Sequence, residues 1–275
     1  MNKDKINLLM EKIDKYTENN IIIAFSGGVD SSLLLKLACI SSASKGTTVY
    51  AVTMKSIFNS AEDIEVSKKI AAETGAEHII LYADNFEELG ITDNPPDRCY
   101  ICKKNIFTLL VNKAESLNIK TILDGTNADD MHLYRPGIKA LKELGILSPL
   151  ADSNFTKAEV RELAAYYNIS VSKRPSTPCL ATRFPYNTHI TNIDLEKAEK
   201  GENYLKSLGL YNVRLRIHGN IARIETDADA MPLIISLRTQ IAEKLKQLGY
   251  NYITLDIEGF RSGSMDIDIE NFNNS

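Results

Sequence analysis

The sequence has 275 residues, enough for one or two domains with a sizeable core. Hydrophobic residues make up 44% and charged residues 25%, and the net charge is −4, so no overall positive field attracts nucleic acid or an anionic membrane. The N-terminal segment has no continuous apolar stretch of the kind found in signal peptides, and no apolar run approaches the ~18–20 residues that span a bilayer. We therefore expect a soluble, cytoplasmic protein that binds neither nucleic acid nor membrane.

In chain order, short apolar runs alternate with helical patterns as far as about residue 170. Strands are expected at 21–25, 47–54, 77–83 and 120–125, and the main helices at 61–75, 102–118 and 156–168. In the last of these helices, Thr156 as N-cap and Glu159 form a capping box. Strands that alternate with helices predict an α/β fold with a doubly wound parallel sheet.

The pattern changes after this region. Residues 171–192 contain three prolines and show no period, so we expect an ordered loop there. The elements expected beyond it are helix, strand, strand, helix and strand, at 194–208, 212–219, 221–226, 229–247 and 252–257. This order predicts a smaller α+β domain with an antiparallel pair at its centre, and we place the two domains at 1–185 and 186–275.

A turn rich in glycine and serine follows the first strand. The stretch "AFSGGVDSSLLLKLA", beginning at Ala24, puts two glycines after the strand and Ser31 and Ser32 at the start of a helix. Because the first helical turn has unpaired N–H groups and the positive end of the helix dipole, it binds anions readily. The turn lacks the Walker lysine, so we expect the pyrophosphate part of ATP as its ligand, with Asp30 placed to hold Mg²⁺. A tight Gly-Gly turn capped by serines is the alternative.

A second polar segment, "DGTNADD" at 124–130, follows the fourth strand, where ligand sites of parallel sheets lie. Alone it is also typical of a simple Asn/Asp turn. Together the two segments resemble those of the PP-loop ATP pyrophosphatases, which split ATP between its α- and β-phosphates and carry the motif S-G-G-x-D-S-[ST]. The residues that match the family are Ser26, Gly27, Gly28, Asp30, Ser31 and Ser32 in the first segment and Gly125, Thr126, Asn127 and Asp130 in the second.

Three of the four cysteines form a pattern that suits a metal. Cys99-x-x-Cys102 opens a helix, and Cys179 is a remote third thiol. Three thiolates are too few for a closed Cys₄ site, but with a [4Fe–4S] cluster they leave one iron open to sulfide or a substrate atom. Structural Zn²⁺ with His132 or His189, a redox pair and inert thiols remain alternatives. Cys39 lies on the apolar face of the helix after the glycine turn, where we expect a core residue.

The chain further resembles, almost end to end, the ATP-dependent sulfur transferases of nickel-pincer nucleotide biosynthesis, the LarE family. The strings that carry this resemblance include "YRPGIKALKELGILSPL", "CLATRFPY", "VRLRIHGNIARIE" and "YITLDIEGFRSG". Some members of the family have only the cysteine that corresponds to Cys179 and sacrifice its sulfur. Others have all three cysteines and are thought to hold a [4Fe–4S] cluster. This sequence has the three-cysteine pattern, so the resemblance implies that Cys99, Cys102 and Cys179 are cluster ligands, with sacrifice of Cys179 as the alternative.

The resemblance also implies a reaction. ATP with Mg²⁺ adenylates a carboxylate of pyridinium-3,5-biscarboxylic acid mononucleotide, and sulfide carried on the open iron then gives the thiocarboxylate and AMP. A product of this kind serves nickel-pincer enzymes such as lactate racemase. Sulfide or another sulfur donor, this small-molecule substrate and a homo-oligomeric assembly are the partners that we expect.

A mononucleotide substrate with carboxylates needs cationic partners. In "VRLRIH" the period of two puts Arg214, Arg216 and His218 on one face of a strand, and two arginine forks make a plausible phosphate clamp. Arg183 is a candidate for contacting a substrate or transition-state anion. On the next strand Arg223 and Glu225 share a face, and Glu202 is a further candidate for this cluster. A solvated strand face with an ordinary ion pair is the alternative.

Three other functions fit parts of the pattern. A tRNA-thiolating PP-loop enzyme could use the same three cysteines, but no further cysteine pairs and no basic domain for RNA are present. An ATP-dependent amidase or ligase would explain the phosphate loop and leave the cysteines without a role. A nucleotide-binding sensor without catalysis would be excluded by turnover of ATP to AMP.

Overall fold

The computed structural model describes residues 2–131, 136–175, 177–261 and 263–266. Contacts between Cα atoms divide the chain into two compact units, which we call the first and the second unit: Met1–Asn85 with Asp97–Thr177, and Phe86–Pro96 with Pro178–Ser275. In the part of the chain that the structure describes, no helix is both long and apolar enough to cross a bilayer.

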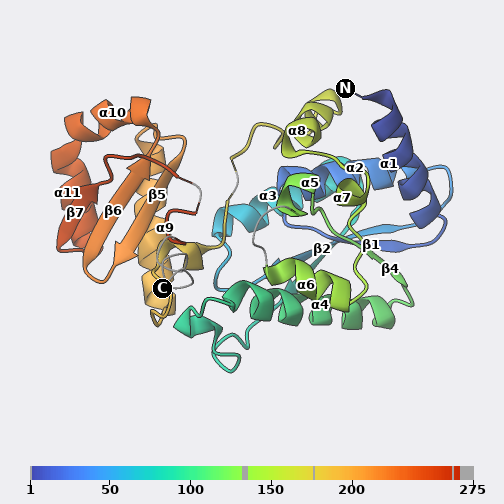
Figure 1. The fold of residues 1–275 in the computed structure, drawn as a ribbon, viewed down its shortest axis with the longest axis horizontal. Coiled ribbons are helices and arrows are strands. Elements are labelled where there is room, and N and C mark those ends of the chain that lie inside the picture. The colour runs from blue at the N-terminus through green and yellow to red at the C-terminus, as the bar shows by residue number, and fades with distance from the viewer. Residues whose placement is uncertain (1, 132–135, 176, 262, 267–275) are drawn as a thin grey trace. The chain divides into compact units, whose positions relative to one another are not determined.

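The first unit contains α1 (Lys3–Tyr16), β1 (Ile21–Ala24), α2 (Val29–Ser42), β2 (Val49–Lys55), α3 (Ala61–Thr74), β3 (Glu77–Tyr82), α4 (Arg98–Ser116), β4 (Thr121–Leu123), α5 (Ala128–Met131), α6 (Pro136–Glu143), α7 (Pro149–Asp152) and α8 (Lys157–Tyr166). Its four strands form one sheet in the order β3-β2-β1-β4, and every neighbouring pair is parallel. Figure 1 shows α1, α2 and α8 on one side of this sheet and α4 and α6 on the other. The predicted doubly wound parallel α/β fold is therefore confirmed.

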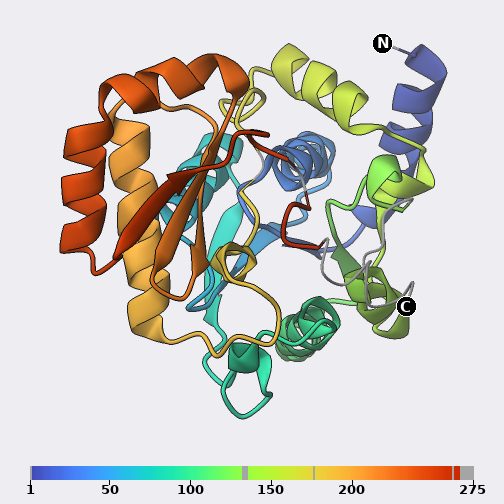
Figure 2. The same cartoon turned by 60° about the vertical axis from the view of Figure 1, so that its left-hand side comes forward.

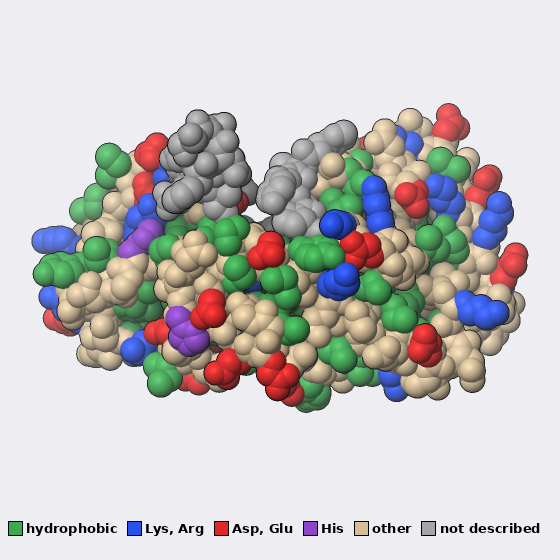
Figure 3. All heavy atoms as spheres, turned by 60° about the horizontal axis from the view of Figure 1, so that its bottom comes forward, with side chains coloured by type: hydrophobic (Ala, Val, Ile, Leu, Met, Phe, Trp, Pro, Cys, Tyr) green, Lys and Arg blue, Asp and Glu red, His purple; other side chains and the backbone are tan. Residues whose placement is uncertain are grey.

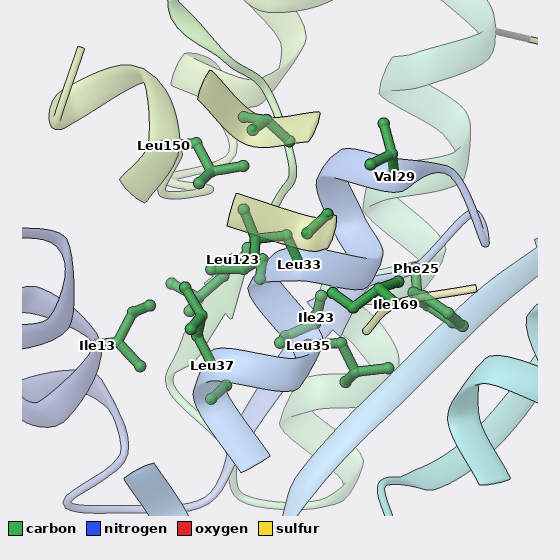
Figure 4. Packing of buried hydrophobic residues seen from close by; sticks show 14 of the residues in the cluster. Ile13, Ile23, Phe25, Val29, Leu33, Leu35, Leu37, Leu123, Leu150 and Ile169 are labelled. Atoms are coloured by element: carbon green, nitrogen blue, oxygen red, sulfur yellow. The ribbon is translucent and has the colours of Figure 1, made fainter. Parts of the chain in front are cut away.

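Both faces of the sheet are buried because side chains of β1 alternate between two apolar clusters. Ile21 and Ile23 pack with α1, α2 and α8, whereas Ile22 packs with residues of α4 and α6. Helix α2 lies in the interior: Leu33, Leu34, Leu35 and Leu37 are all fully buried. Figure 4 shows Leu33, Leu35 and Leu37 among side chains from neighbouring elements of the same cluster. The phosphate loop is thus anchored to the most deeply buried helix of the unit.

Local signals set the ends of several helices as the sequence predicts. Ser60 caps α3 by accepting from the N–H of Asp63, and Gly75 ends the helix in the left-handed conformation with φ of 78°. Thr156 and Glu159 form the predicted capping box at the start of α8.

The second unit contains two short 3₁₀ turns, η1 (Ile91–Asp93) and η2 (Leu180–Arg183), followed by α9 (Asn192–Ser207), β5 (Val213–His218), β6 (Ile221–Thr226), η3 (Ala228–Ala230), α10 (Met231–Ser236), α11 (Arg238–Gln247) and β7 (Tyr252–Leu255). Its sheet has the order β5-β6-β7, with β5 antiparallel and β7 parallel to β6. Figure 2 shows α9 and α11 side by side against this sheet. The predicted antiparallel pair is present, with β6 as the central strand.

The predicted helix 229–247 is interrupted at Leu237. Its backbone ψ of 10° separates α10 from α11, while the N–H of Leu237 still bonds Leu233 O and the N–H of Ile241 bonds Leu237 O. Ile234 before the bend and Ile241 after it are both buried. The bend therefore keeps the apolar sides of both segments on the core of the second unit. The hydrophobic period of the sequence continues through Leu237, so it does not reveal the bend.

Candidate functional site

The glycine turn and the 124–130 segment meet at one point of the first unit. Strands β1 and β4 are neighbours, with Ile23 paired to Leu123, and the chain leaves β1 for the β2 side of the sheet before returning to β4 on the other side. This is a topological switch point, where the loops after the carboxyl ends of two adjacent strands enclose a crevice. The two predicted segments are those loops.

The glycine turn exposes the amino end of α2 to a ligand. Gly27 has a φ of 73°, a conformation that favours glycine, and a Cβ there would lie 3.2 Å from the Ser67 backbone. Gly28 is the N-cap, and no side chain in the described residues caps it by a hydrogen bond. Ser31 Oγ lies 3.2 Å from Gly28 O and from Ser26 Oγ, which folds the turn back on the helix start. The N–H groups of the first turn are therefore available to an anion.

Ser32 provides an independent sign that a ligand belongs here. Its side chain is fully buried, and within the described chain its hydroxyl has no hydrogen-bond partner. Buried hydroxyls are nearly always satisfied, because an unpaired one costs about 1–3 kcal/mol. A polar ligand at the turn would satisfy this group, so the residues present fit the phosphates of ATP.

The 124–130 segment lies directly against the glycine turn. A Cβ on Gly125 would be only 2.7 Å from the backbone nitrogen of Ser31, an approach that only glycine allows. Asn127 Nδ2 donates to Asp30 Oδ1 at 3.1 Å. Asn127 and Asp130 also bond each other through side chain and backbone, which fixes the start of α5. The structure thus brings the two predicted segments together, with Gly125 against Ser31 and Asn127 bonded to Asp30.

Two residues of this site were not predicted from the sequence. Lys157, the first residue of α8, forms an ion pair with Asp30 Oδ2, so a lysine does reach the loop that lacks its own. Asp124 accepts from Thr126 Oγ1 and from Ser148 Oγ, each at 2.5 Å, and so fixes the turn after β4. Lys157 is 127 residues from Asp30, and no local spacing connects them. Asp124 lies in the segment 124–130, but an aspartate at the end of a strand is also typical of a simple turn, so the sequence does not mark it as a site residue.

The cysteine pair lies in the first unit, on the first turns of α4. Cys99 is exposed and Cys102 is partly buried, and their i, i+3 spacing places them on one side of the helix. The buried Arg98 places Nη2 4.0 Å from the sulfur of Cys99.

Cys179 lies in the second unit, exposed, as the residue before η2. Arg183 holds its loop: Nη1 donates to Pro178 O at 2.9 Å, to Cys179 O at 3.3 Å and to Thr182 Oγ1 at 2.9 Å. The other edge of the guanidinium forms a bidentate pair with Glu202, at 2.7 Å and 2.9 Å. Arg183, which the sequence assigns to a substrate or transition-state anion, therefore positions the cysteine loop in this structure.

Chain segments next to Cys99 and Cys179 are tied together by Asn94. This buried residue, five positions before Cys99, donates from Nδ2 to Phe184 O at 3.1 Å and to Pro185 O at 2.7 Å, just after the Cys179 loop. Its own carbonyl accepts from the N–H of Asn187 at 2.9 Å. All these bonds lie within the second unit. They join the segment 86–96 of the second unit to the residues that follow the Cys179 loop.

The strand arginines are buried and not solvated. Arg216 donates from Nε to Glu225 Oε2 at 2.9 Å and from Nη1 to Thr182 O at 3.0 Å, and the Arg214 guanidinium lies over the ring of Phe260. Burial, together with the positive charge of Arg183, lowers the pKa of Arg214 and of Arg216. The ordinary pKa of arginine is so high that both side chains still stay charged at neutral pH. The alternative of a solvated strand face is therefore wrong.

The zinc alternative with a histidine ligand stays untested. His189 Nδ1 lies 2.6 Å from Asp93 Oδ1 on an exposed surface of the second unit. His132 lies outside the described residues. Across the described ranges, no three side chains of the metal-binding types gather into one site. Cys99 and Cys102 belong to one unit and Cys179 to the other, so their role as a ligand set stays a prediction.

Cys39 packs against the core of the first unit, and burial raises the pKa of its thiol to about 11. A thiol with this pKa is protonated at neutral pH and unreactive. We expect iodoacetamide at neutral pH to alkylate the exposed Cys99 and Cys179 in folded protein prepared without iron, and to spare Cys39. Peptide mass spectrometry measures this, and labelling of Cys39 without prior unfolding would contradict it.

A parallel doubly wound sheet with a glycine-serine phosphate loop at its switch point defines the PP-loop class of ATP-using proteins. Comparison with known proteins agrees: residues 17–159, more than half of the chain, match the asparagine synthase family. The chain is 34% identical over 245 residues to the pyridinium-3,5-bisthiocarboxylic acid mononucleotide synthase of Lactiplantibacillus plantarum, covering 89% of this chain and 88% of that one.

Two further relatives resemble the chain to different degrees. An uncharacterised protein of Synechocystis is 35% identical over 246 residues, covering 89% of this chain and 91% of its own. The tRNA-specific 2-thiouridylase of Rickettsia bellii is 24% identical over 246 residues, covering 74% of this chain and 64% of its own. The chain belongs to the LarE family of ATP-dependent sulfur transferases, within the PP-loop superfamily. It is thus an enzyme of the type that uses ATP to transfer sulfur.

Proposed function

We propose that this enzyme adenylates a carboxylate of pyridinium-3,5-biscarboxylic acid mononucleotide and converts it to a thiocarboxylate, in two rounds for the two carboxylates. The observation that carries this proposal is the match, over 89% of the chain, to the synthase of the bisthiocarboxylic product. The phosphate loop and the cysteine pattern supply the two chemical requirements, a nucleotide site and a sulfur site.

The first unit would carry out the adenylation. The amino end of α2, with Ser31 and Ser32, holds the phosphates, and Asp30 together with Asn127 lies where Mg²⁺ would bind. A substrate carboxylate oxygen attacks the α-phosphorus, the bond from that phosphorus to the bridging oxygen breaks, and pyrophosphate leaves with the electron pair. The product is an acyl-adenylate, in which the attacking carboxylate oxygen is bonded to phosphorus and can leave as part of AMP, a far better leaving group than the oxygen of a free carboxylate.

The sulfur step replaces AMP. The sulfur of sulfide attacks the acyl carbon, the C–O bond to AMP breaks with its electron pair on oxygen, and a thiocarboxylate remains. Cys99, Cys102 and Cys179 are the residues that would hold a [4Fe–4S] cluster, and such a cluster, when bound, supplies an iron with a vacant position for sulfide. Cys99 and Cys179 are exposed and Cys102 is partly buried, so each unit offers at least one thiol that a cluster could reach. Sacrifice of the Cys179 sulfur is the alternative route.

We infer that Arg214 and Arg216 attract the phosphate of the mononucleotide. Both arginines lie on one face of β5, opposite Glu225 and Arg223 of β6. The planar fork of an arginine matches the oxygens of a phosphate, so a phosphate bound at this strand would accept charge-assisted hydrogen bonds.

Thiolation of tRNA is the second candidate, since thiouridylases are distant relatives. Such an enzyme needs a broad basic surface for the RNA backbone. On the face drawn in Figure 3, the described acidic and basic side chains are interspersed and do not gather into one basic area. This face therefore offers no such surface to RNA.

The test uses protein purified without oxygen and supplied with ATP, Mg²⁺, sulfide and the biscarboxylic substrate. We expect AMP, pyrophosphate and a product whose mass shows oxygen replaced by sulfur, together with iron and acid-labile sulfide that are lost in Cys99→Ala. Turnover without iron, accompanied by dehydroalanine at position 179, would replace the cluster by the sacrificial route. Thiolation of tRNA and not of the mononucleotide would overturn the proposal.

A further inference from the structure

The segment 86–96 belongs to the second unit, although the elements before and after it in the sequence, β3 and α4, belong to the first. Its last part is paired with the chain that follows the third cysteine. Thr92 O accepts from the N–H of Ile190 at 2.7 Å. Asn94 O accepts from the N–H of Asn187 at 2.9 Å. These bonds give the residues after the cysteine loop a fixed neighbour inside their own unit.

Asn94 adds two bonds from its side chain. Nδ2 donates to Phe184 O at 3.1 Å and to Pro185 O at 2.7 Å, so both amide hydrogens are used. The residue is fully buried, and its φ of 53° lies in the left-handed region that asparagine and glycine tolerate best. Among the described residues Oδ1 has no hydrogen-bond partner. Turning the amide over would set this oxygen against both carbonyls, so the loop alone dictates how the amide lies.

Side chains hold the Cys179 loop by its backbone. The carbonyl groups that accept from Arg183, Arg216 or Asn94 are those of Pro178, Cys179, Thr182, Phe184 and Pro185. Arg216 is also one of the two residues that we assign to the phosphate of the substrate. A guanidinium that turns toward a phosphate shares its hydrogens between the anion and the loop, whereas a neutral amide has no such attraction. Asn94 is therefore the donor that retains its bonds to the loop when an anion is bound.

We propose that Asn94 is a positioning residue of the sulfur step: through the carbonyls of Phe184 and Pro185 it keeps the Cys179 loop in place while the substrate engages the arginines. This inference rests on the proposed sulfur transfer and adds a residue to it. It applies whether Cys179 binds a cluster or gives up its own sulfur, since both routes need sulfur at a fixed distance from the acyl carbon.

A displaced loop should uncouple the two halves of the reaction. A reacting group misplaced by about 1 Å loses about 100-fold in rate. The acyl-adenylate then reacts with water instead: the oxygen of water attacks the acyl carbon, and the C–O bond to AMP breaks with its electron pair on oxygen. The original carboxylate returns, and ATP is spent without a thiocarboxylate. A contact that only stabilises the second unit is the competing explanation, and it would not change the coupling.

The same loop offers a matched control. Asn187 also has a left-handed backbone, with φ of 59°, and its side chain is exposed. Glycine adopts this conformation without strain and retains the N–H that bonds Asn94 O. Asn94→Gly and Asn187→Gly are therefore the same exchange at two left-handed positions of one unit, and only Asn94→Gly removes the two donors to the loop.

The experiment measures thiocarboxylate and AMP formed by protein purified without oxygen and supplied with ATP, Mg²⁺, sulfide and the biscarboxylic substrate. We expect the ratio of thiocarboxylate to AMP to fall by about 10- to 100-fold in Asn94→Gly and to keep its wild-type value in Asn187→Gly. A smaller folded fraction lowers both products together and leaves this ratio unchanged. Hydrogen exchange of peptides that cover 180–186 is a second readout without turnover, and it should be faster in Asn94→Gly alone.

Loss of activity in Asn94→Gly with an unchanged ratio would overturn the proposal in favour of a structural contact. An equal fall of the ratio in Asn187→Gly would overturn it too, because the effect would not come from the amide. If the wild type forms AMP but no thiocarboxylate, the substrate assignment fails by itself, and hydrogen exchange decides about Asn94. Faster exchange over 180–186 in Asn94→Gly would then support its hold on the loop, and unchanged exchange would overturn it.

Discussion

Replacing Arg183 by methionine should lower the free energy of unfolding by about 3–5 kcal/mol, because it leaves Glu202 as an unpaired buried charge. The Arg183 and Glu202 side chains are 2% and 4% exposed and joined by two hydrogen bonds. Glu202 Oε1 also accepts from the N–H of Leu215 at 3.0 Å, which attaches α9 to β5. Denaturant unfolding followed by circular dichroism measures the loss.

The pH dependence of this loss has a defined sign. Burial by itself would raise the pKa of Glu202, but the charge and hydrogen bonds of Arg183 and the Leu215 N–H outweigh it and lower the pKa. Stability from a lowered carboxyl pKa is fully present above the unfolded-state pKa and is lost as the pH falls through the folded-state pKa. The difference between wild type and Arg183→Met should therefore be largest at neutral pH and shrink in acid.

A double variant separates the charge effect from loss of packing. Adding Glu202→Gln to Arg183→Met removes the buried charge and retains the shape, so part of the stability should return. A loss below about 1 kcal/mol in the single variant would mean that water reaches Glu202 and that the pair behaves like a surface ion pair. In that case Arg183 would not be the residue that fixes the Cys179 loop.

The sequence predicts those features that depend on neighbouring residues. The strand β1, the glycine turn after it and the capping box of α8 each lie within a few positions, so hydrophobic period and turn chemistry suffice. The pairing of Lys157 with Asp30 and of Asn94 with Phe184 depends on segments that the tertiary fold brings together across 127 and 90 residues. No local pattern reports such pairs.

Strand β5, which carries Arg214 and Arg216, shows a different limit of prediction from the sequence. A period of two correctly places Arg214 and Arg216 on one face, because each opposes a residue of β6 on that face, Glu225 and Arg223. Periodicity cannot tell whether that face meets water or the interior. In the structure every residue of β5 up to Ile217 is buried, so the charged face is an interior one whose partners come from the loop after Cys179 and from β6.

Replacing Gly125 by alanine should weaken ATP binding and turnover by at least about 100-fold, because the added methyl has no room. Its Cβ would lie 2.7 Å from Ser31 N and 3.1 Å from Asp30 C, and both are backbone atoms that cannot rotate away. The glycine turn and the 124–130 segment must therefore separate. A displacement of about 1 Å between the groups that hold a substrate costs about 100-fold in rate. Calorimetry with an ATP analogue that has a methylene bridge between its α- and β-phosphates, and the rate of AMP formation, measure the two effects.

Gly137→Ala is the matched control for the added methyl. Gly137 lies in α6, where the three atoms nearest to a Cβ all belong to the side chain of Lys103, which is flexible and can move aside. Nucleotide binding should therefore survive in Gly137→Ala, while alanine in a helix tends to stabilise it. Equal nucleotide affinity in Gly125→Ala and Gly137→Ala would mean that the two loops tolerate separation. Close packing of the 124–130 segment on the amino end of α2 would then not be what forms the phosphate site.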